Sequence, residues 1–146
     1  MNRSGYLHVL LQFVGAGITC LAAATAQTPW GPLPLIIIAL GAVIGLYTIT
    51  HNRIGNFNVA PPLKTHAQLI TSGPYKWVRH PMYLSVIVVL VGLSLHAGTI
   101  PAWVGALVSS HAMYQKTVIE EQLLLERFPE YAAYRTSTKR MLPFIF

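Results

Sequence analysis

The chain has 146 residues, which is enough for one domain, and its composition differs from that of a water-soluble protein. Apolar residues make up 53% of the sequence and charged residues only 10%, whereas a soluble domain has roughly a quarter charged residues. The net charge of +6 does not indicate nucleic-acid binding, because the basic residues lie beside apolar tracts and are not spread over a soluble face. The sequence therefore predicts an integral membrane protein with no nucleic-acid partner.

The first half of the chain predicts two membrane spans, at about 6–26 and 33–50. No Lys, Arg, Asp or Glu stands between Arg3 and Arg53, a tract longer than the ~20 residues that one span needs. Residues 1–26 have the pattern of a secretory signal, but a second apolar run follows directly, so we expect a retained first span. In the second span, Gly41 and Gly45 form a GxxxG pair, which favours close helix packing within the chain.

Residues 51–80 are polar and proline-containing, and they predict an irregular loop. The stretch from 50 to 62 holds the candidate substrate-binding residues His51, Arg53 and Asn58. These side chains either contact a substrate or belong to a folded loop, and the sequence leaves both readings open.

The second half predicts spans at about 81–96 and 101–118, joined by a turn at 96–101. The fourth helix is expected to continue past Lys116, because 15 residues are only about 22 Å long at 1.5 Å per residue. A final amphipathic helix is expected over 129–140, with Pro129 in its first turn.

The distribution of basic residues predicts the topology. With Arg3 on the cytoplasmic side, four spans put every Lys and Arg on that side. Basic residues that flank membrane spans usually lie on the cytoplasmic side. We expect an all-α, multi-pass membrane protein with one domain over 1–146, about four transmembrane helices and a cytosolic C-terminal helical segment. Both termini and the active site are then cytoplasmic, in the inner membrane if the source is bacterial.

The antiparallel third and fourth spans bring Arg79 and His80 close to Glu120 and Glu121. Pro81 suits the first position of a helix, whose free amides beside a basic pair favour a carboxylate or a phosphate. The two glutamates can accept hydrogen bonds from an ammonium group or from ribose. Aromatic side chains nearby can stack on a purine or lie near a cation: Tyr75, Trp77 and Tyr83. The alternative is that basic and aromatic residues only anchor the helix ends at the membrane interface.

Three stretches carry a resemblance to a known family: "GPYKWVRHPMY", then "EEQLLLERFPEYAAYR", then "KRMLP". They are similar to the C-terminal half of the isoprenylcysteine carboxyl methyltransferases. They also resemble the phospholipid methyltransferases. The resemblance covers roughly residues 71–143. The matching positions are Arg79, His80, Pro81, Tyr83, Glu120, Glu121, Phe128, Glu130, Tyr131, Tyr134, Arg140 and Pro143. Ser85 departs from the pattern, which often has glycine there.

The resemblance implies a membrane methyltransferase that uses S-adenosyl-L-methionine and releases S-adenosylhomocysteine. The acceptor is expected to be lipophilic or membrane-delivered: an isoprenylcysteine-like carboxylate, a lipid or a small thiol. We expect Arg79 and Glu120 to be catalytic, and no metal. The cofactor-binding residues are expected to be Tyr75, Trp77, His80, Pro81, Tyr83, Glu121 and Tyr134. An Arg79→Ala variant is expected to lose turnover more than cofactor affinity.

Other classes remain open. A glutathione-dependent four-span enzyme would be expected to carry charged residues in its second span, and residues 33–50 hold none. A membrane reductase would bind a dinucleotide in place of S-adenosylmethionine. A non-catalytic membrane scaffold predicts that His80→Ala and Glu121→Ala change nothing beyond insertion.

Overall fold

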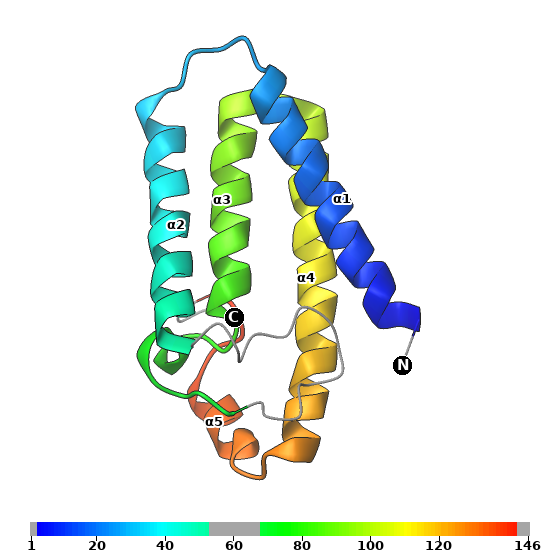
Figure 1. Cartoon of the computed structure of the whole chain (residues 1–146), viewed down its shortest axis with the longest axis vertical. Coiled ribbons are helices and arrows are strands. Elements are labelled where there is room, and N and C mark those ends of the chain that lie inside the picture. The colour runs from blue at the N-terminus through cyan, green and yellow to red at the C-terminus, as the bar shows by residue number, and fades with distance from the viewer. Residues whose placement is uncertain (1–2, 53–67, 143–146) are drawn as a thin grey trace.

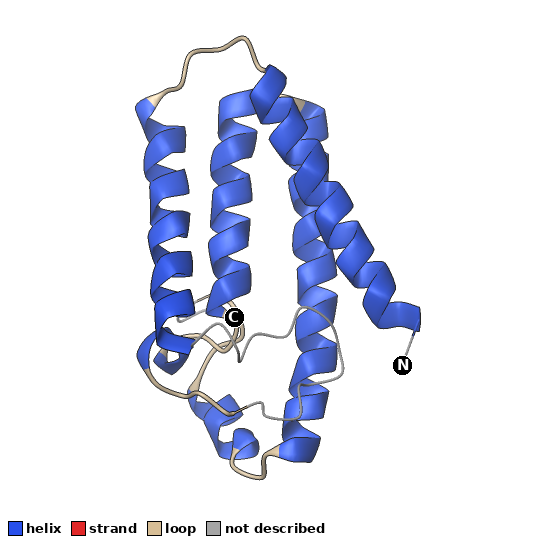
Figure 2. Cartoon of the chain, viewed as in Figure 1, coloured by secondary structure: helices blue, strands red, loops and turns tan. Residues whose placement is uncertain are grey.

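The computed structural model describes residues 3–52 and 68–142, which form a bundle of four long helices with short helical segments at one end (Figure 1). The described part of the chain is helical and contains no strand, apart from an isolated parallel bridge between Val78 and Lys139 (Figure 2). The elements are α1 (Arg3–Thr25), α2 (Pro32–Asn52), the 3-10 helix η2 (Gly73–Lys76), α3 (Pro81–Ala97), α4 (Ile100–Arg127) and α5 (Tyr131–Ser137). The all-α prediction is confirmed.

Two of the four expected spans have the length and apolarity that a membrane crossing needs. These are Gly5–Thr25 in α1 and the whole of α2, Pro32–Asn52. α3 is apolar but has only 17 residues, so its support is weaker. α4 continues past Lys116 as expected and reaches Arg127, and the charged residues of its second half set it apart from a purely apolar span.

The long helices pack as two pairs, α1 against α4 and α2 against α3. Glycines permit the close approach in both pairs. A Cβ atom on Gly105 would lie 2.6 Å from the carbonyl oxygen of Gly15, and one on Gly45 would lie 2.5 Å from Ser85 Oγ. Ser85 Oγ donates a hydrogen bond of 2.9 Å to the Gly41 carbonyl. The Gly41–Gly45 pair therefore packs against α3 inside the chain, as the sequence predicted.

We call the end of the bundle where α1 leads toward α2 and α3 leads into α4, residues 19–34 and 90–102, the far end. It is packed from small side chains, with a core of Ala23, Ala97 and Ala102. The hydroxyls of Thr19 and Ser94 both donate to the Ala102 carbonyl, at 3.0 and 3.2 Å. The Ala102 carbonyl oxygen, a polar atom inside this apolar region, thus accepts two hydrogen bonds.

The opposite end, residues 73–83 and 116–142, is the site end, and two expectations about local structure are wrong there. α2 continues through Asn52, so His51 lies in its last turn and not in a loop. The last helix is Tyr131–Ser137 and not 129–140. It is shorter because the backbone of Lys139 and Arg140 pairs with Arg79 and His80 instead of continuing the helix.

Candidate active site

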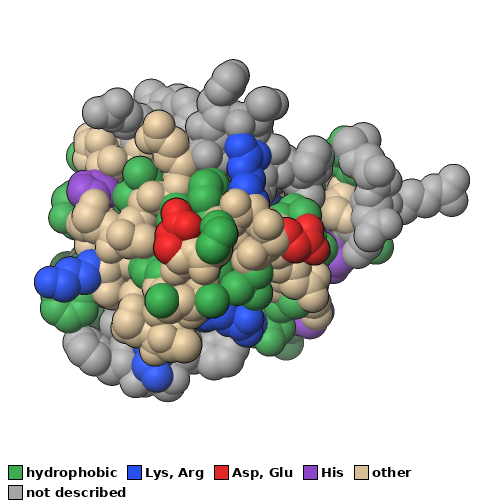
Figure 3. All heavy atoms as spheres, turned by 90° about the horizontal axis from the view of Figure 1, so that it is seen from below, with side chains coloured by type: hydrophobic (Ala, Val, Ile, Leu, Met, Phe, Trp, Pro, Cys, Tyr) green, Lys and Arg blue, Asp and Glu red, His purple; other side chains and the backbone are tan. Residues whose placement is uncertain are grey.

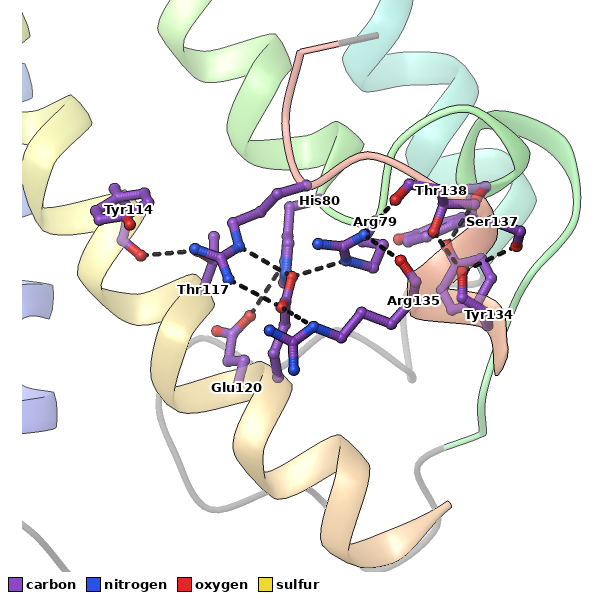
Figure 4. A network of polar contacts seen from close by, with 12 residues as sticks. Arg79, His80, Tyr114, Thr117, Glu120, Tyr134, Arg135, Ser137 and Thr138 are labelled. Carbon is purple, nitrogen blue, oxygen red and sulfur yellow. Dashed lines mark hydrogen bonds and ion pairs between the residues drawn. The ribbon is translucent and has the colours of Figure 1, made fainter. Parts of the chain in front are cut away.

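Two segments far apart in sequence lie side by side at the start of α3. The amide of Arg79 donates to the Lys139 carbonyl at 2.8 Å, and the amide of His80 donates to the Arg140 carbonyl at 3.0 Å. Pro81 is the first residue of α3 and is buried, as its missing N–H allows at that position. This pairing directs the side chains of Arg79, His80 and Arg140 toward the second half of α4 (Figure 4).

Glu121 lies at the centre of the resulting network and is 2% exposed. Its Oε1 accepts hydrogen bonds from Arg79 Nε at 2.8 Å and from Arg140 Nε at 3.2 Å. Its Oε2 lies 3.1 Å from Arg140 Nη2 and 3.5 Å from Arg135 Nε. Burial alone would raise the pKa of Glu121, but the hydrogen bonds from His80, Arg79 and Arg140 outweigh it and lower the pKa to about 2. Glu121 is therefore an ionised, fully engaged carboxylate.

Arg79 connects this carboxylate to the C-terminal segment. Its Nη1 donates to the carbonyl oxygens of Arg135, at 3.1 Å, and of Thr138. The same guanidinium thus holds α4, α5 and the segment after α5 together, which gives it a structural task within the site.

Glu120 precedes Glu121 in the chain, and its surroundings are different. Its Oε1 accepts a hydrogen bond of 2.5 Å from the Tyr83 hydroxyl, and its Oε2 lies 3.6 Å from His80 Nδ1. No Lys or Arg nitrogen of the described residues lies within 4 Å of this carboxylate. Burial raises the pKa of Glu120, which makes it the better proton acceptor of the two near neutral pH.

His80 lies between the two glutamates. Its Nε2 is 3.3 Å from Glu121 Oε1, while Nδ1 faces Glu120. The imidazole also stacks on Tyr83, with ring centroids 5.7 Å apart and an angle of 13° between the planes. His80 and Tyr83 therefore join the two carboxylates into one network.

The other aromatic candidates divide into structural and exposed residues. The Tyr134 hydroxyl donates to the Tyr75 carbonyl at 2.6 Å, which ties α5 to η2, and burial raises the pKa of Tyr134 to about 12. Trp77 is 57% exposed. Tyr131 is buried, yet its hydroxyl has no hydrogen-bond partner in the structure. A buried, unpartnered hydroxyl can bond to a ligand.

The expected substrate-binding residues are only partly placed. His51 is at the site end, where its Nε2 lies 2.9 Å from Ser72 Oγ. Its ring also lies against Gly73, where an added Cβ would be 2.5 Å away and where φ is +60°. Only glycine fits that position. Arg53 and Asn58, and Pro143 of the family pattern, lie outside the described residues.

Sequence reasoning missed Lys116 as a site residue. It is 2% exposed, its Nζ donates to Gln12 Oε1 at 3.0 Å, and it lies 5.0 Å from the centre of the Tyr83 ring. The signal was available, since a lysine one turn before a glutamate at the end of an apolar segment is a polar residue at depth.

The buried part of the site end carries an excess of positive charge. Three arginines surround one carboxylate, Glu121, and the outermost of them, Arg135, has a side chain that is 44% exposed. Glu126 and Glu130 are exposed, and the surface of this end shows acidic and basic side chains at separate places (Figure 3). The interior thus combines an engaged carboxylate, a second carboxylate with no described Lys or Arg nitrogen within 4 Å, and cations that favour an anionic ligand group.

Comparison with known proteins identifies the family of this chain. The family model described as phospholipid methyltransferase matches residues 32–131, which include both glutamates and the Arg-His-Pro segment. The chain is 34% identical over 144 residues to the cobalt-zinc-cadmium resistance protein CzcN of Cupriavidus metallidurans, covering 97% of this chain and 64% of that protein. It is 26% identical over 133 residues to the nickel-cobalt-cadmium resistance protein NccN of Alcaligenes xylosoxydans, covering 89% of this chain and 62% of the relative. The chain therefore spans less than two thirds of the length of these relatives.

Proposed function

This chain belongs to the phospholipid methyltransferase family, and from that membership we propose that it transfers a methyl group from S-adenosyl-L-methionine to a lipophilic acceptor. The family and the two apolar helices make it a membrane protein. The observation that carries the proposal is the pair of adjacent glutamates: Glu121 is buried and bonded to arginines, whereas Glu120 is partly buried and accepts a hydrogen bond from Tyr83.

The residues at the site end suit the chemical groups of S-adenosyl-L-methionine. That ligand carries an ammonium and a sulfonium, which a carboxylate without a cationic partner attracts, and a carboxylate, which an excess of arginine attracts. The buried Tyr131 hydroxyl offers a further hydrogen bond. When bound, the cofactor supplies a methyl group on a positively charged sulfur.

In this proposal Glu120 holds the ammonium or a ribose hydroxyl, or takes the proton that a thiol or amine acceptor releases. Its raised pKa suits the second task. His80 and Tyr83 orient Glu120, and Glu121 fixes the arginines. Arg79 bonds to Glu121 and to two carbonyls, so we assign it a positioning role in place of the catalytic role expected from the sequence.

The acceptor reaches the site from the lipid phase, because the helices around it expose apolar side chains, among them Leu10 and Phe13 of α1. The positive-inside rule supports a cytoplasmic position for the site end, because basic residues that flank spans usually stay on that side.

The relatives are named for resistance to nickel, cobalt, cadmium and zinc. We propose that methyl transfer by the present chain also takes part in resistance to such metals. The described residues bring no group of three His, Cys, Asp or Glu side chains together at metal-binding spacing. Growth of a metal-sensitive host that expresses the wild type or Glu120→Gln would test whether protection follows methyl transfer.

The direct test is calorimetric titration of the detergent-purified protein with S-adenosylhomocysteine, with NADPH and glutathione as competing candidates. We expect saturable binding of S-adenosylhomocysteine alone, weakened by His80→Ala and by Glu121→Ala. Glu126→Gln is a matched control, because Glu126 is an exposed glutamate on the same helix.

Binding of NADPH or glutathione instead would assign the site to a reductase or to a glutathione-dependent enzyme. A folded sample that binds none of the three would favour a non-catalytic scaffold.

A further inference from the structure

Lys116 is a buried cation that the proposed reaction leaves without a task. Its ammonium group has three donors, and its one hydrogen bond to the described residues goes to the neutral side-chain oxygen of Gln12. No carboxylate of the described residues lies within 4 Å of it. Burying a charge costs free energy unless a partner compensates it. Two donors of a fully buried ammonium are therefore available to a ligand.

The surroundings of Lys116 are built by α1 as well as by α4. Ser109 Oγ donates to the Gln12 carbonyl at 2.9 Å, which fixes α1 against α4 at this level. His8 lies one turn before Gln12 on the same face of α1, and its Nδ1 is buried without a hydrogen-bond partner. An unpartnered polar atom and an ammonium without a carboxylate within 4 Å among the described residues thus occur in neighbouring turns of the α1–α4 contact.

Lys116 also lies close to the candidate active site. It precedes Glu120 by four residues, so the two lie on one face of α4, about 6 Å apart along the axis. The Tyr83 ring contacts both, since it lies 5.0 Å from Lys116 Nζ and its hydroxyl bonds to Glu120. An anion held by Lys116 therefore lies within one helical turn of the carboxylate to which we assign the proton or the cofactor.

We propose that Lys116, held in place by Gln12 and with His8 as a second polar contact, binds an oxyanion of the methyl acceptor, a carboxylate or a phosphate on a lipophilic molecule. The proposal rests on the proposed methyl transfer and adds a recognition site to it. α1 lies outside the residues that match the family, 32–131. The contact thus joins a residue inside the family match, Lys116, to residues of α1 outside it.

The test measures binding of three probes to the purified full chain by calorimetry: S-farnesylthiopropionate, its uncharged primary amide, and farnesyl phosphate. We expect the wild type to bind at least one of the two anions about tenfold more tightly than the amide, as a charge-assisted hydrogen bond implies. Lys116→Met should abolish that preference, and Gln12→Leu should reduce it. Gln115→Leu is the matched control, since Gln115 is a partly buried neighbour whose side chain contacts His111 and not Lys116.

Binding of S-adenosylhomocysteine is measured on every variant, as a check of folding and of the cofactor site. If the wild type does not bind it, the proposed function fails, whatever the probes do. If all variants bind it but Lys116→Met keeps the preference for the anion, the acceptor site is wrong. Equal binding of all three probes by the wild type, or binding of none, also overturns it. If Lys116→Met does not fold, the comparison of Gln12→Leu with Gln115→Leu decides: a preference for the anion that Gln12→Leu does not reduce relative to Gln115→Leu overturns the proposal. The carboxylate and phosphate probes distinguish an acid from a lipid head group.

Discussion

The two ends of the helix bundle are held together by different forces. At the far end, alanines pack closely and hydroxyls bond to one carbonyl, while Trp30 stacks on His96 with ring centroids 3.5 Å apart. At the site end, arginines from three segments converge on Glu121. Close packing of small residues is enough to join helices, so the far end is held together without buried charges. The difference concentrates buried charge at the end to which we assign the proposed cofactor site.

The largest effect is expected from Glu121→Gln, which removes the charge at the centre of the site end. Breaking a buried ion pair by removing one partner costs about 3–5 kcal/mol, because the remaining charges stay buried. Unfolding of the detergent-solubilised protein, followed by circular dichroism, measures the loss. A loss no larger than that of Glu126→Gln would mean that the arginines find solvent, and the contrast between the ends would disappear.

Acid should weaken the site end more than the far end. The pKa of Glu121 is about 2 in the folded chain against the usual 4.5, so its contribution, on the order of 3 kcal/mol, is present above pH ~4.5 and is lost as the pH falls through ~2. The raised pKa of Glu120 acts in the opposite sense. The measurement therefore uses Glu120→Gln, and follows the protection factors of amide hydrogen exchange, which correct for the pH dependence of intrinsic exchange, at both ends between about pH 5 and pH 3. An equal fall in protection at both ends would contradict the prediction.

A smaller effect is expected from overpacking the far end. Ala102 is fully buried, and Ala102→Leu should cost about 1–3 kcal/mol. Affinity for S-adenosylhomocysteine in the folded fraction should stay unchanged, because no site residue contacts Ala102. Calorimetry on the variant tests this. A parallel loss of affinity would show that the two ends are coupled through α3 and α4.

The sequence predicted the parts of this architecture that depend on composition and spacing. Apolar tracts bounded by prolines predicted the helices, and the short turn at 96–101 made α3 and α4 antiparallel neighbours. Antiparallel neighbours bring the start of one helix to the end of the other, so the meeting of Arg79 and His80 with Glu120 and Glu121 followed.

The features that the sequence did not predict depend on backbone pairing and on contacts between helices that are distant in the sequence. The bridge between Val78 and Lys139 involves two residues with no strand pattern around them, and it shortens the last helix. It also decides which arginine engages which carboxylate. The contact of Lys116 with Gln12 depends on the rotation of α1 against α4, which the spacing of apolar residues does not specify.

The arrangement around Glu121 has a consequence for how this sequence can change over generations. One carboxylate serves several cations, so the loss of one arginine leaves it with the remaining partners. Losing the carboxylate instead leaves all the cations facing one another. Exchanges should therefore accumulate first at the most exposed of the three arginines, Arg135, and last at Glu121. The site should therefore tolerate substitution of one of its cations better than substitution of its central anion, Glu121, for which no other residue can substitute.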